Sequence, residues 1–142
     1  MRDNNVNKSI TKIIYSFKDA SVPPQYHRSY TITVTSDQAH ILVDSYGDIL
    51  ADATIDIPEQ KIDDLARYIE IYQVKEKDRK SDTTICTGGT SKSLTIYSDE
   101  NIVLNGTVYQ CGGRLEGNLL GDIDSFAEKI ESLIPDFTNL LK

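Results

Sequence analysis

The chain is poor in cysteine, in long apolar runs and in basic residues, and each shortage excludes a class of protein. Two cysteines in 142 residues are too few for a disulfide scaffold, so a hydrophobic core must hold the fold. No apolar run approaches the roughly 20 residues that span a bilayer. No apolar segment follows Arg2 as it would in a secretory signal, so we expect a cytoplasmic protein.

The shortage of basic residues gives the chain its charge. Lys and Arg total 15 against 22 Asp and Glu, for a formal net charge of −7. An acidic surface repels phosphate groups, so we expect binding to neither nucleic acid nor membrane. It would attract a basic protein instead. The simpler interpretation is that the charge keeps a small domain soluble.

What remains is a globular composition, 39% hydrophobic and 26% charged, in a length that suits one domain. We therefore assign residues 1–142 to a single domain. Residues 1–10 are mostly polar, and we expect them to form a frayed N-terminal tail.

Alternation of apolar and polar residues predicts four strands in the first part of the chain. The clearest passes through Tyr30, Ile32 and Val34, which alternate with threonines. The other three are centred on residues 13–17, 41–43 and 49–57. Together they predict a hairpin-linked meander with one wet face.

Two segments instead have the three- and four-residue period of amphipathic helices. The first starts at Pro58, which suits the first helical position, and ends in the charged run 75–80. The second starts at Asp122, a good N-cap, and breaks at Pro135. Their apolar stripes are Ile62, Leu65, Ala66, Ile69 and Tyr72, and Ile123, Phe126, Ile130, Leu133 and Ile134.

Between these helices we predict three strands, at residues 94–96, 102–104 and 107–109. Asn105-Gly106 separates the last two and is typical of a tight hairpin, because a type I′ turn needs positive φ at both central positions. The glycine-rich segment 112–118 is expected to be flexible.

The resulting order is ββββαβββα. Strands that run in blocks predict an α+β fold with a mainly antiparallel sheet of about seven strands and two amphipathic helices packed on one face. The other face is then wet or available for binding.

Tyr26, His27 and Arg28 form the densest polar cluster, where a Pro-Pro loop enters the clearest strand. Histidine exchanges protons near neutral pH, and arginine forks two hydrogen bonds onto a carboxylate or phosphate. The cluster is therefore a candidate binding site. The alternative, which we favour, is structural: the aromatic rings pack and Arg28 pairs with a nearby acid.

A second candidate site comprises Cys86, Thr87, Gly88, Gly89 and Lys92. Consecutive glycines expose backbone amides that can hold an anion, and the lysine would add positive charge. The spacing is not that of a phosphate-binding loop, however. A conformationally demanding turn is the simpler explanation.

The two cysteines, Cys86 and Cys111, allow three interpretations. They are small core residues, a disulfide, or metal ligands with His27 and His40. No close ligand pair supports a metal site, so we predict none. We expect both thiols to be reduced, because a domain of this length needs no disulfide.

We expect a small acidic protein-binding domain rather than an enzyme, because no catalytic constellation or cofactor motif is recognisable. In size and charge the chain resembles small acidic bacterial immunity or inhibitor proteins that neutralise a basic toxin, which implies a basic protein partner. One alternative is a small-ligand-binding protein or hydrolase-like enzyme with a site built from Tyr26, His27, Arg28 and residues 86–89. Another is a structural subunit that forms a homodimer through edge strands.

Overall fold

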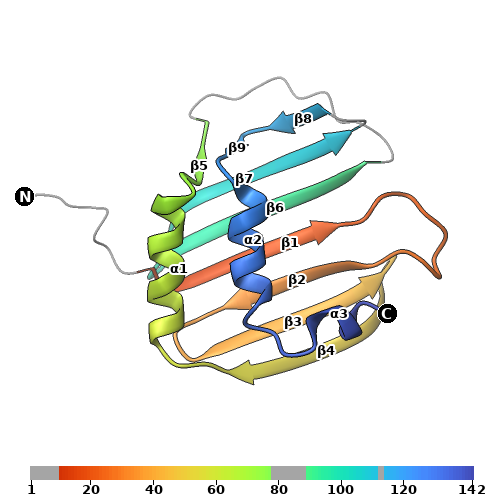
Figure 1. The fold of residues 1–142 in the computed structure, drawn as a ribbon, viewed down its shortest axis with the longest axis horizontal. Helices are drawn as coiled ribbons and strands as arrows, with labels where there is room; N and C mark the ends of the chain where they lie inside the picture. Colours follow the sequence, from red (N-terminus) through yellow and green to blue (C-terminus); the bar gives the residue numbers. More distant parts are fainter. Residues whose placement is uncertain (1–9, 78–88, 112–113) are drawn as a thin grey trace, which may run out of the picture.

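The computed structural model describes residues 10–77, 89–111 and 114–142, and its main element is a seven-stranded antiparallel sheet (Figure 1). The order across the sheet is β4-β3-β2-β1-β6-β7-β8, and a separate pair is formed by β5 and β9. The strands are β1 (Lys12–Lys18), β2 (Ser29–Val34), β3 (Gln38–Ser45), β4 (Asp48–Asp56), β5 (Lys75–Glu76), β6 (Thr90–Ser98), β7 (Asn101–Cys111), β8 (Arg114–Gly117) and β9 (Leu119–Leu120).

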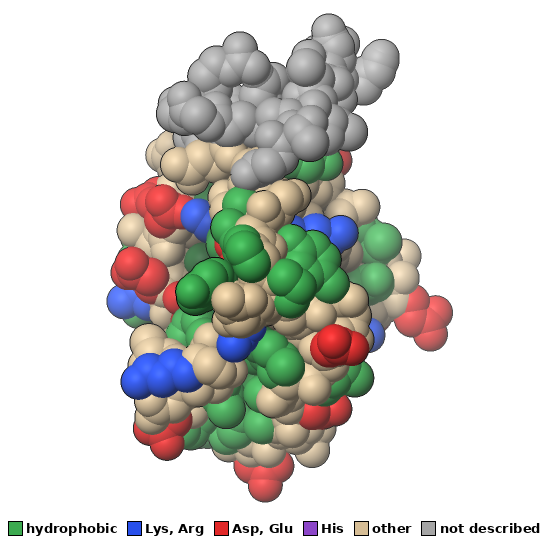
Figure 2. Space-filling view, turned by 90° about the vertical axis from the view of Figure 1, so that its right-hand side faces the viewer, with side chains coloured by type: hydrophobic (Ala, Val, Ile, Leu, Met, Phe, Trp, Pro, Cys, Tyr) green, Lys and Arg blue, Asp and Glu red, His purple; other side chains and the backbone are tan. Residues whose placement is uncertain are grey.

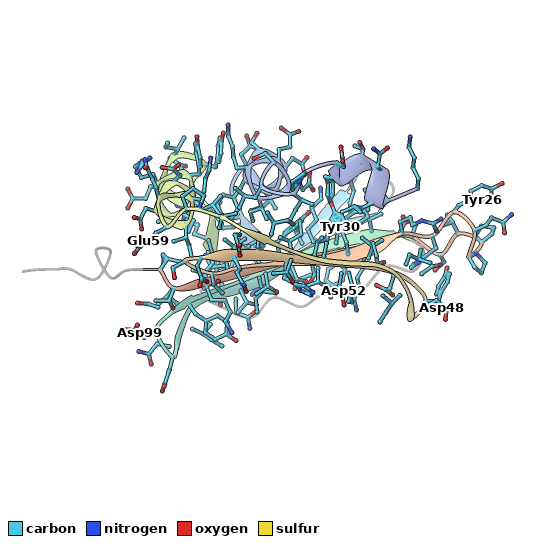
Figure 3. All side chains as sticks on the ribbon, turned by 90° about the horizontal axis from the view of Figure 1, so that it is seen from below. Tyr26, Tyr30, Asp48, Asp52, Glu59 and Asp99 are labelled. Carbon is cyan, nitrogen blue, oxygen red and sulfur yellow. The ribbon has the colours of Figure 1, made fainter. Side chains whose placement is uncertain are left out.

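The helices α1 (Gln60–Ile71), α2 (Ile123–Glu131) and α3 (Phe137–Leu140) all lie on one face of this sheet (Figures 1 and 3). The predicted α+β fold, with a mainly antiparallel sheet and helices on one face, is confirmed. Within the described segments, no helix is both long enough and apolar enough to cross a membrane.

The core lies between the sheet and the helices. Alternate residues of the central strands are fully buried and face α1 and α2, as the period of two requires. Its largest members include Tyr15, Ile32, Ile41, Leu94, Ile96, Phe126 and Ile130. The opposite face of the sheet carries no helix in the described part of the chain (Figure 3).

Both predicted helices are present, and the start of α2 is as expected. The Asp122 carboxylate accepts a hydrogen bond from the Ser125 amide at 3.1 Å, which caps the helix. The end of α1 differs from the prediction. The helix stops at Ile71, and Gln73 takes a positive φ of 56°. The charged run then begins as the short strand β5 rather than as helix.

The predicted Asn105-Gly106 hairpin is wrong. β7 runs unbroken through both residues, which pair with Thr95 and Leu94 of β6. The second and third strands predicted between the helices are therefore one strand, and the turn before it lies at Asp99, whose φ is +57°. Long-range pairing with β6 overrides the local turn preference. Gly106 serves packing instead, since an added Cβ would lie 3.2 Å from the Leu119 side chain.

Part of the predicted flexible segment 112–118 is a strand, while residues 112 and 113 lie outside the described residues. Residues 114–117 form β8, which pairs antiparallel with β7 at the edge of the sheet. Glycine content suggested a loop, but Gly117 has a φ of +122° and lies against the Thr107 carbonyl, where no side chain would fit.

Candidate protein-binding surface

The loop that joins β1 to β2 is fastened onto the turn between β3 and β4. The Ser45 hydroxyl donates to the carbonyl of Pro24 at 2.9 Å, and the Tyr46 hydroxyl donates to the carbonyl of Val22 at 2.7 Å. The turn itself is tight: Tyr46 and Gly47 have φ values of +50° and +94°. The proline loop and this hairpin therefore form one end of the molecule (Figure 3).

Of the predicted cluster, His27 is a packing residue. Its side chain is only 6% exposed and stacks on Tyr46 with ring centroids 3.8 Å apart. Its Nδ1 has no hydrogen-bond partner among the described residues. Tyr26, by contrast, is 68% exposed and points outward from this end of the molecule (Figure 3).

Arg28 contributes to the structure of the loop. One guanidinium nitrogen, Nη1, donates to the carbonyl of His27 at 2.7 Å and to that of Pro24 at 3.4 Å. Its backbone amide donates to the Asp19 carboxylate at 2.9 Å. A guanidinium engaged with backbone carbonyls at this loop is poorly placed to bind an external anion.

Four large hydrophobic side chains are exposed at or beside this end: Tyr26, Tyr46, Ile49 and Leu50. Figure 2 views this end directly and shows hydrophobic side chains gathered in its middle, with side chains of both charges around them. Apolar side chains that cluster on a surface mark an interaction site more often than scattered ones do.

Carboxylates follow the same hairpin. Its acids are Asp44, Asp48, Asp52 and Asp56, and no Lys or Arg occurs anywhere in residues 29–60. We call the acids together with Tyr46, Ile49 and Leu50 the acidic hairpin surface. Asp48 lies at the same end as Tyr26, whereas Asp52 lies on the open face of the sheet (Figure 3).

The hairpin itself contains no Lys or Arg, and the nearest cation along the sheet is Arg28, which directly precedes the residue that pairs with Asp44. Asp52 contacts the His40 ring nitrogen Nε2 at 2.8 Å, and Asp44 accepts from the Gly47 amide at 2.9 Å. Asp48, Asp52 and Asp56 are exposed, so the hairpin presents their negative charge to solvent.

The middle of the open sheet face has a different character. Its hydroxyl and amide side chains bind one another across neighbouring strands: Ser16 to Thr31 at 3.0 Å, Ser93 to Thr107 at 3.0 Å, and Thr95 to Asn105 at 3.1 Å. These groups already have partners, so this region gains less from an external ligand than the hairpin does.

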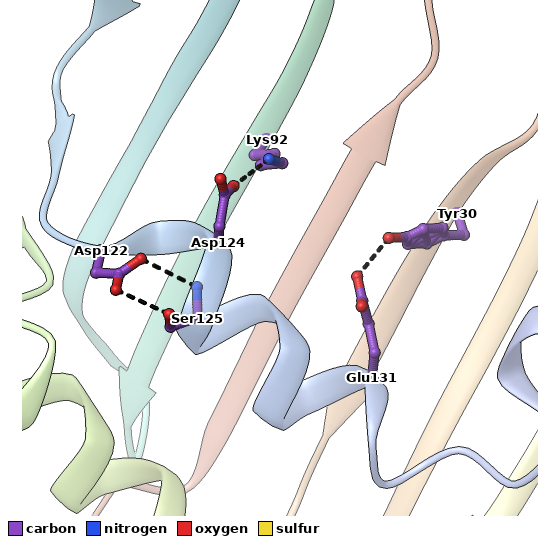
Figure 4. A network of polar contacts seen from close by, with 6 residues as sticks. All are labelled: Tyr30, Lys92, Asp122, Asp124, Ser125 and Glu131. Atoms are coloured by element: carbon purple, nitrogen blue, oxygen red, sulfur yellow. Dashed lines mark hydrogen bonds and ion pairs between the residues drawn. The ribbon is translucent and has the colours of Figure 1, made fainter.

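A pocket of about 590 Å³ lies on the helical side, between the start of α2 and the strands β6 and β7. Its charged lining includes Lys92 and Asp124, which form an ion pair (Figure 4). The predicted candidate Lys92 is thus already neutralised. Tyr26, His27 and Arg28 are not among the described residues that line this pocket.

The rest of the second predicted cluster is only partly visible. Gly89 directly precedes β6, while Cys86, Thr87 and Gly88 lie outside the described residues. Cys111 ends β7. The part of the chain that the structure describes holds no group of three side chains able to bind a metal ion.

No protein-family model, curated protein or solved structure matches this chain. The function must therefore be inferred from the surface itself.

Reasoning from the sequence missed the acidic hairpin surface. The net charge of the whole chain includes 15 basic residues, so it does not reveal a segment that contains acids alone. A count by segment provides the signal: residues 29–60 contain six acids and neither Lys nor Arg. The exposed positions of Ile49 and Leu50 had no such signal, because the alternation around them suggested a half-buried strand.

Proposed function

We propose that this chain is a protein-binding domain that captures a basic protein through the acidic hairpin surface. One observation carries the proposal: exposed Tyr46, Ile49 and Leu50 lie among carboxylates that no Lys or Arg of residues 29–60 offsets. An apolar centre with a charged rim is the usual construction of a protein-binding surface.

The two kinds of side chain have separate tasks. The apolar side chains supply affinity when a partner removes them from water. The carboxylates attract a basic surface, raise the association rate and reject acidic competitors. Binding that depends on both is sensitive to salt but does not vanish at moderate ionic strength.

A more specific form of this proposal is an immunity or inhibitor protein. The β3–β4 hairpin, held by the ladder between β3 and β2 and by the proline loop, would cover a positively charged site on the partner and block it. Small size, a net charge of −7 and one preformed end support this form, since a preformed surface loses little entropy on binding.

The test is capture of a partner from the source cell with two matched variants. The first carries Asp48→Asn, Asp52→Asn and Asp56→Asn. The control carries Asp63→Asn, Glu70→Gln and Glu128→Gln, which are exposed on the helices. Both variants change the net charge by the same amount, so only the position of the charge differs.

At about 0.05 M salt, wild type and the control should retain one stoichiometric basic protein, and the hairpin variant should lose most of it. At about 0.5 M salt, retention should fall for all three proteins. A partner that the hairpin variant holds as well as wild type would contradict the proposal.

A further inference from the structure

The outer edge of β4 is an unpaired edge of the main sheet. β4 is the first strand in the sheet order and pairs only with β3 among the described residues (Figure 1). It is nine residues long. An edge of this length presents a row of backbone donors and acceptors that can pair with another strand.

Two hydrogen bonds fix which backbone groups point outward. The Ile57 amide donates to the Asp37 carbonyl at 3.0 Å, and the Thr35 amide donates to the Gln38 carbonyl at 2.8 Å. Facing pairs of residues along an antiparallel ladder are hydrogen-bonded and non-bonded in alternation. Both bonds lead to the same assignment of which facing pairs of β3 and β4 are hydrogen-bonded.

In this assignment, the hydrogen-bonded pairs between β3 and β4 are Ala39–Ile55, Ile41–Ala53 and Val43–Ala51. The amides and carbonyls of Asp52, Thr54 and Asp56 then point away from β3, out of the sheet. The edge therefore offers a regular set of hydrogen-bonding groups at alternate residues.

The side chains of β4 add a chemical pattern to this edge. Asp52, Thr54 and Asp56 are exposed, whereas Ala51, Ala53 and Ile55 are half-buried and pack against the core. A strand added beside β4 would place alternate side chains next to carboxylates and the others next to aliphatic groups.

A second copy of this chain brings a second set of carboxylates to the edge, and in one antiparallel register they lie directly opposite the first set. An antiparallel pair of β4 strands centred on Thr54 would set Asp52 of each copy opposite Asp56 of the other. Like charges directly opposite each other on a sheet are destabilising. A strand with Lys or Arg opposite Asp52 and Asp56 would form favourable pairs of opposite charge there.

We propose that the β4 edge binds an extended segment of the partner as an added strand, in which Lys or Arg alternates with aliphatic residues. This inference rests on the proposed function and specifies how the basic partner is held. Main-chain hydrogen bonds supply affinity in this mode, and the alternating side chains supply specificity.

Peptides as long as β4, nine residues, test the proposal directly. The first alternates Lys and Val, and the second contains the same residues with all lysines in one block. Two further copies of the alternating peptide carry N-methyl groups on the amides of one edge or of the other. Isothermal titration calorimetry measures each Kd.

The alternating peptide should bind at least about tenfold more tightly than the block peptide, because only it matches the period of the edge. Methylation should weaken binding by about tenfold or more on one edge and little on the other, because only one edge pairs with β4. Equal binding of both methylated peptides would overturn the proposal, since charge alone would then explain it.

Thr54→Pro provides a variant of the protein itself. Proline removes the outward-pointing amide of residue 54 without removing a bond to β3, as edge strands tolerate. Thr54→Val is the control, because it keeps the amide. Thr54→Pro should weaken the alternating peptide about tenfold while its melting temperature stays near that of Thr54→Val. Unchanged affinity would count against strand addition.

The outcomes separate this inference from the proposed function. If no peptide binds but partner capture still depends on Asp48, Asp52 and Asp56, strand addition is wrong and the acidic hairpin surface remains the binding site. A purified chain that is a dimer in light scattering, and that Thr54→Pro converts to a monomer, would overturn the assignment of the edge to a basic segment.

Discussion

The contact between Tyr30 and Glu131 links the sheet to the end of α2 (Figure 4). The buried Tyr30 hydroxyl donates to Glu131 Oε2 at 2.6 Å. Burial raises the pKa of Glu131 above its ordinary value of 4.5, and the hydrogen bond from Tyr30 offsets only part of this shift. Burial likewise raises the pKa of Tyr30, so the phenol remains the donor at neutral pH.

This shift predicts a pH dependence of stability. Between pH 4.5 and its higher folded pKa, Glu131 holds more protons in the folded chain than in the unfolded chain. Its contribution to the free energy of unfolding therefore falls as pH rises through that window. Glu131→Gln keeps an acceptor for Tyr30 and removes the titration. We expect the variant to gain stability relative to wild type as pH rises from 4 to 7.

Thermal unfolding of both proteins across this pH range measures the difference. Glu70→Gln, at an exposed position on α1, is the control and should show no such pH-dependent gain. Parallel stability curves for wild type and Glu131→Gln would contradict the prediction.

The sequence alone does not reveal the role of the cluster Tyr26, His27 and Arg28. Their chemistry suits either catalysis or packing, and the choice depends on Tyr46, twenty residues away from Tyr26 along the chain. The stacking of His27 on Tyr46 favours packing for His27, whereas Tyr26 is exposed. Only the path of the β3–β4 hairpin brings these residues together.

At the scale of elements, the junction between β9 and α2 is a tight connection. The Asp122 amide donates to the Tyr72 carbonyl at 2.9 Å, which brings the start of α2 against the end of α1. Gly121, with a φ of +105°, lies so near that an added Cβ would be 2.4 Å from the Gln73 carbonyl oxygen. The two helices depend on this glycine for their spacing.

Gly121→Ala should therefore destabilise the fold by more than about 2 kcal/mol, because the backbone of residue 73 cannot move away cheaply. Gly47→Ala is the matched control: Gly47 also has a positive φ, +94°, but nothing lies within 4 Å of an added Cβ. It should cost only about 1 kcal/mol of conformational strain. Urea unfolding measures both, and equal losses would show that the close contact at Gly121 carries no cost.

At the scale of the whole molecule, charge is unevenly distributed. The β3–β4 hairpin contains four Asp and no Lys or Arg of its own, while Lys92 and Arg67 lie in ion pairs with Asp124 and Asp64. Asp48, Asp52 and Asp56 lie four residues apart along β4, so they repel one another mainly at low salt, where screening is weak.

Removing the repulsion should stabilise the chain. We expect the variant with Asp48→Asn, Asp52→Asn and Asp56→Asn to melt about 2–4 °C higher than wild type at low salt, with the difference shrinking as salt screens the charges. Differential scanning calorimetry at two salt concentrations measures it. A lower melting temperature at every salt concentration would show that these acids stabilise the fold.

The sequence by itself determined the class of fold. Burial of one face of a strand or helix produces a repeating pattern of apolar residues over a short stretch of sequence. This pattern is the period-two alternation in β1 to β4 and the apolar stripe in α1 and α2. Asp122 was identified as a helix cap for the same reason, since its bond to Ser125 spans only three residues.

The tertiary structure decided what depends on partners far apart in the chain. Asn105-Gly106 continues as strand because β6 pairs with it, against its local preference for a turn. The backbone groups of Asp52, Thr54 and Asp56 keep an open side because β4 is the first strand in the sheet order. Strand order is set by long-range packing and pairing, which no local pattern of residues records.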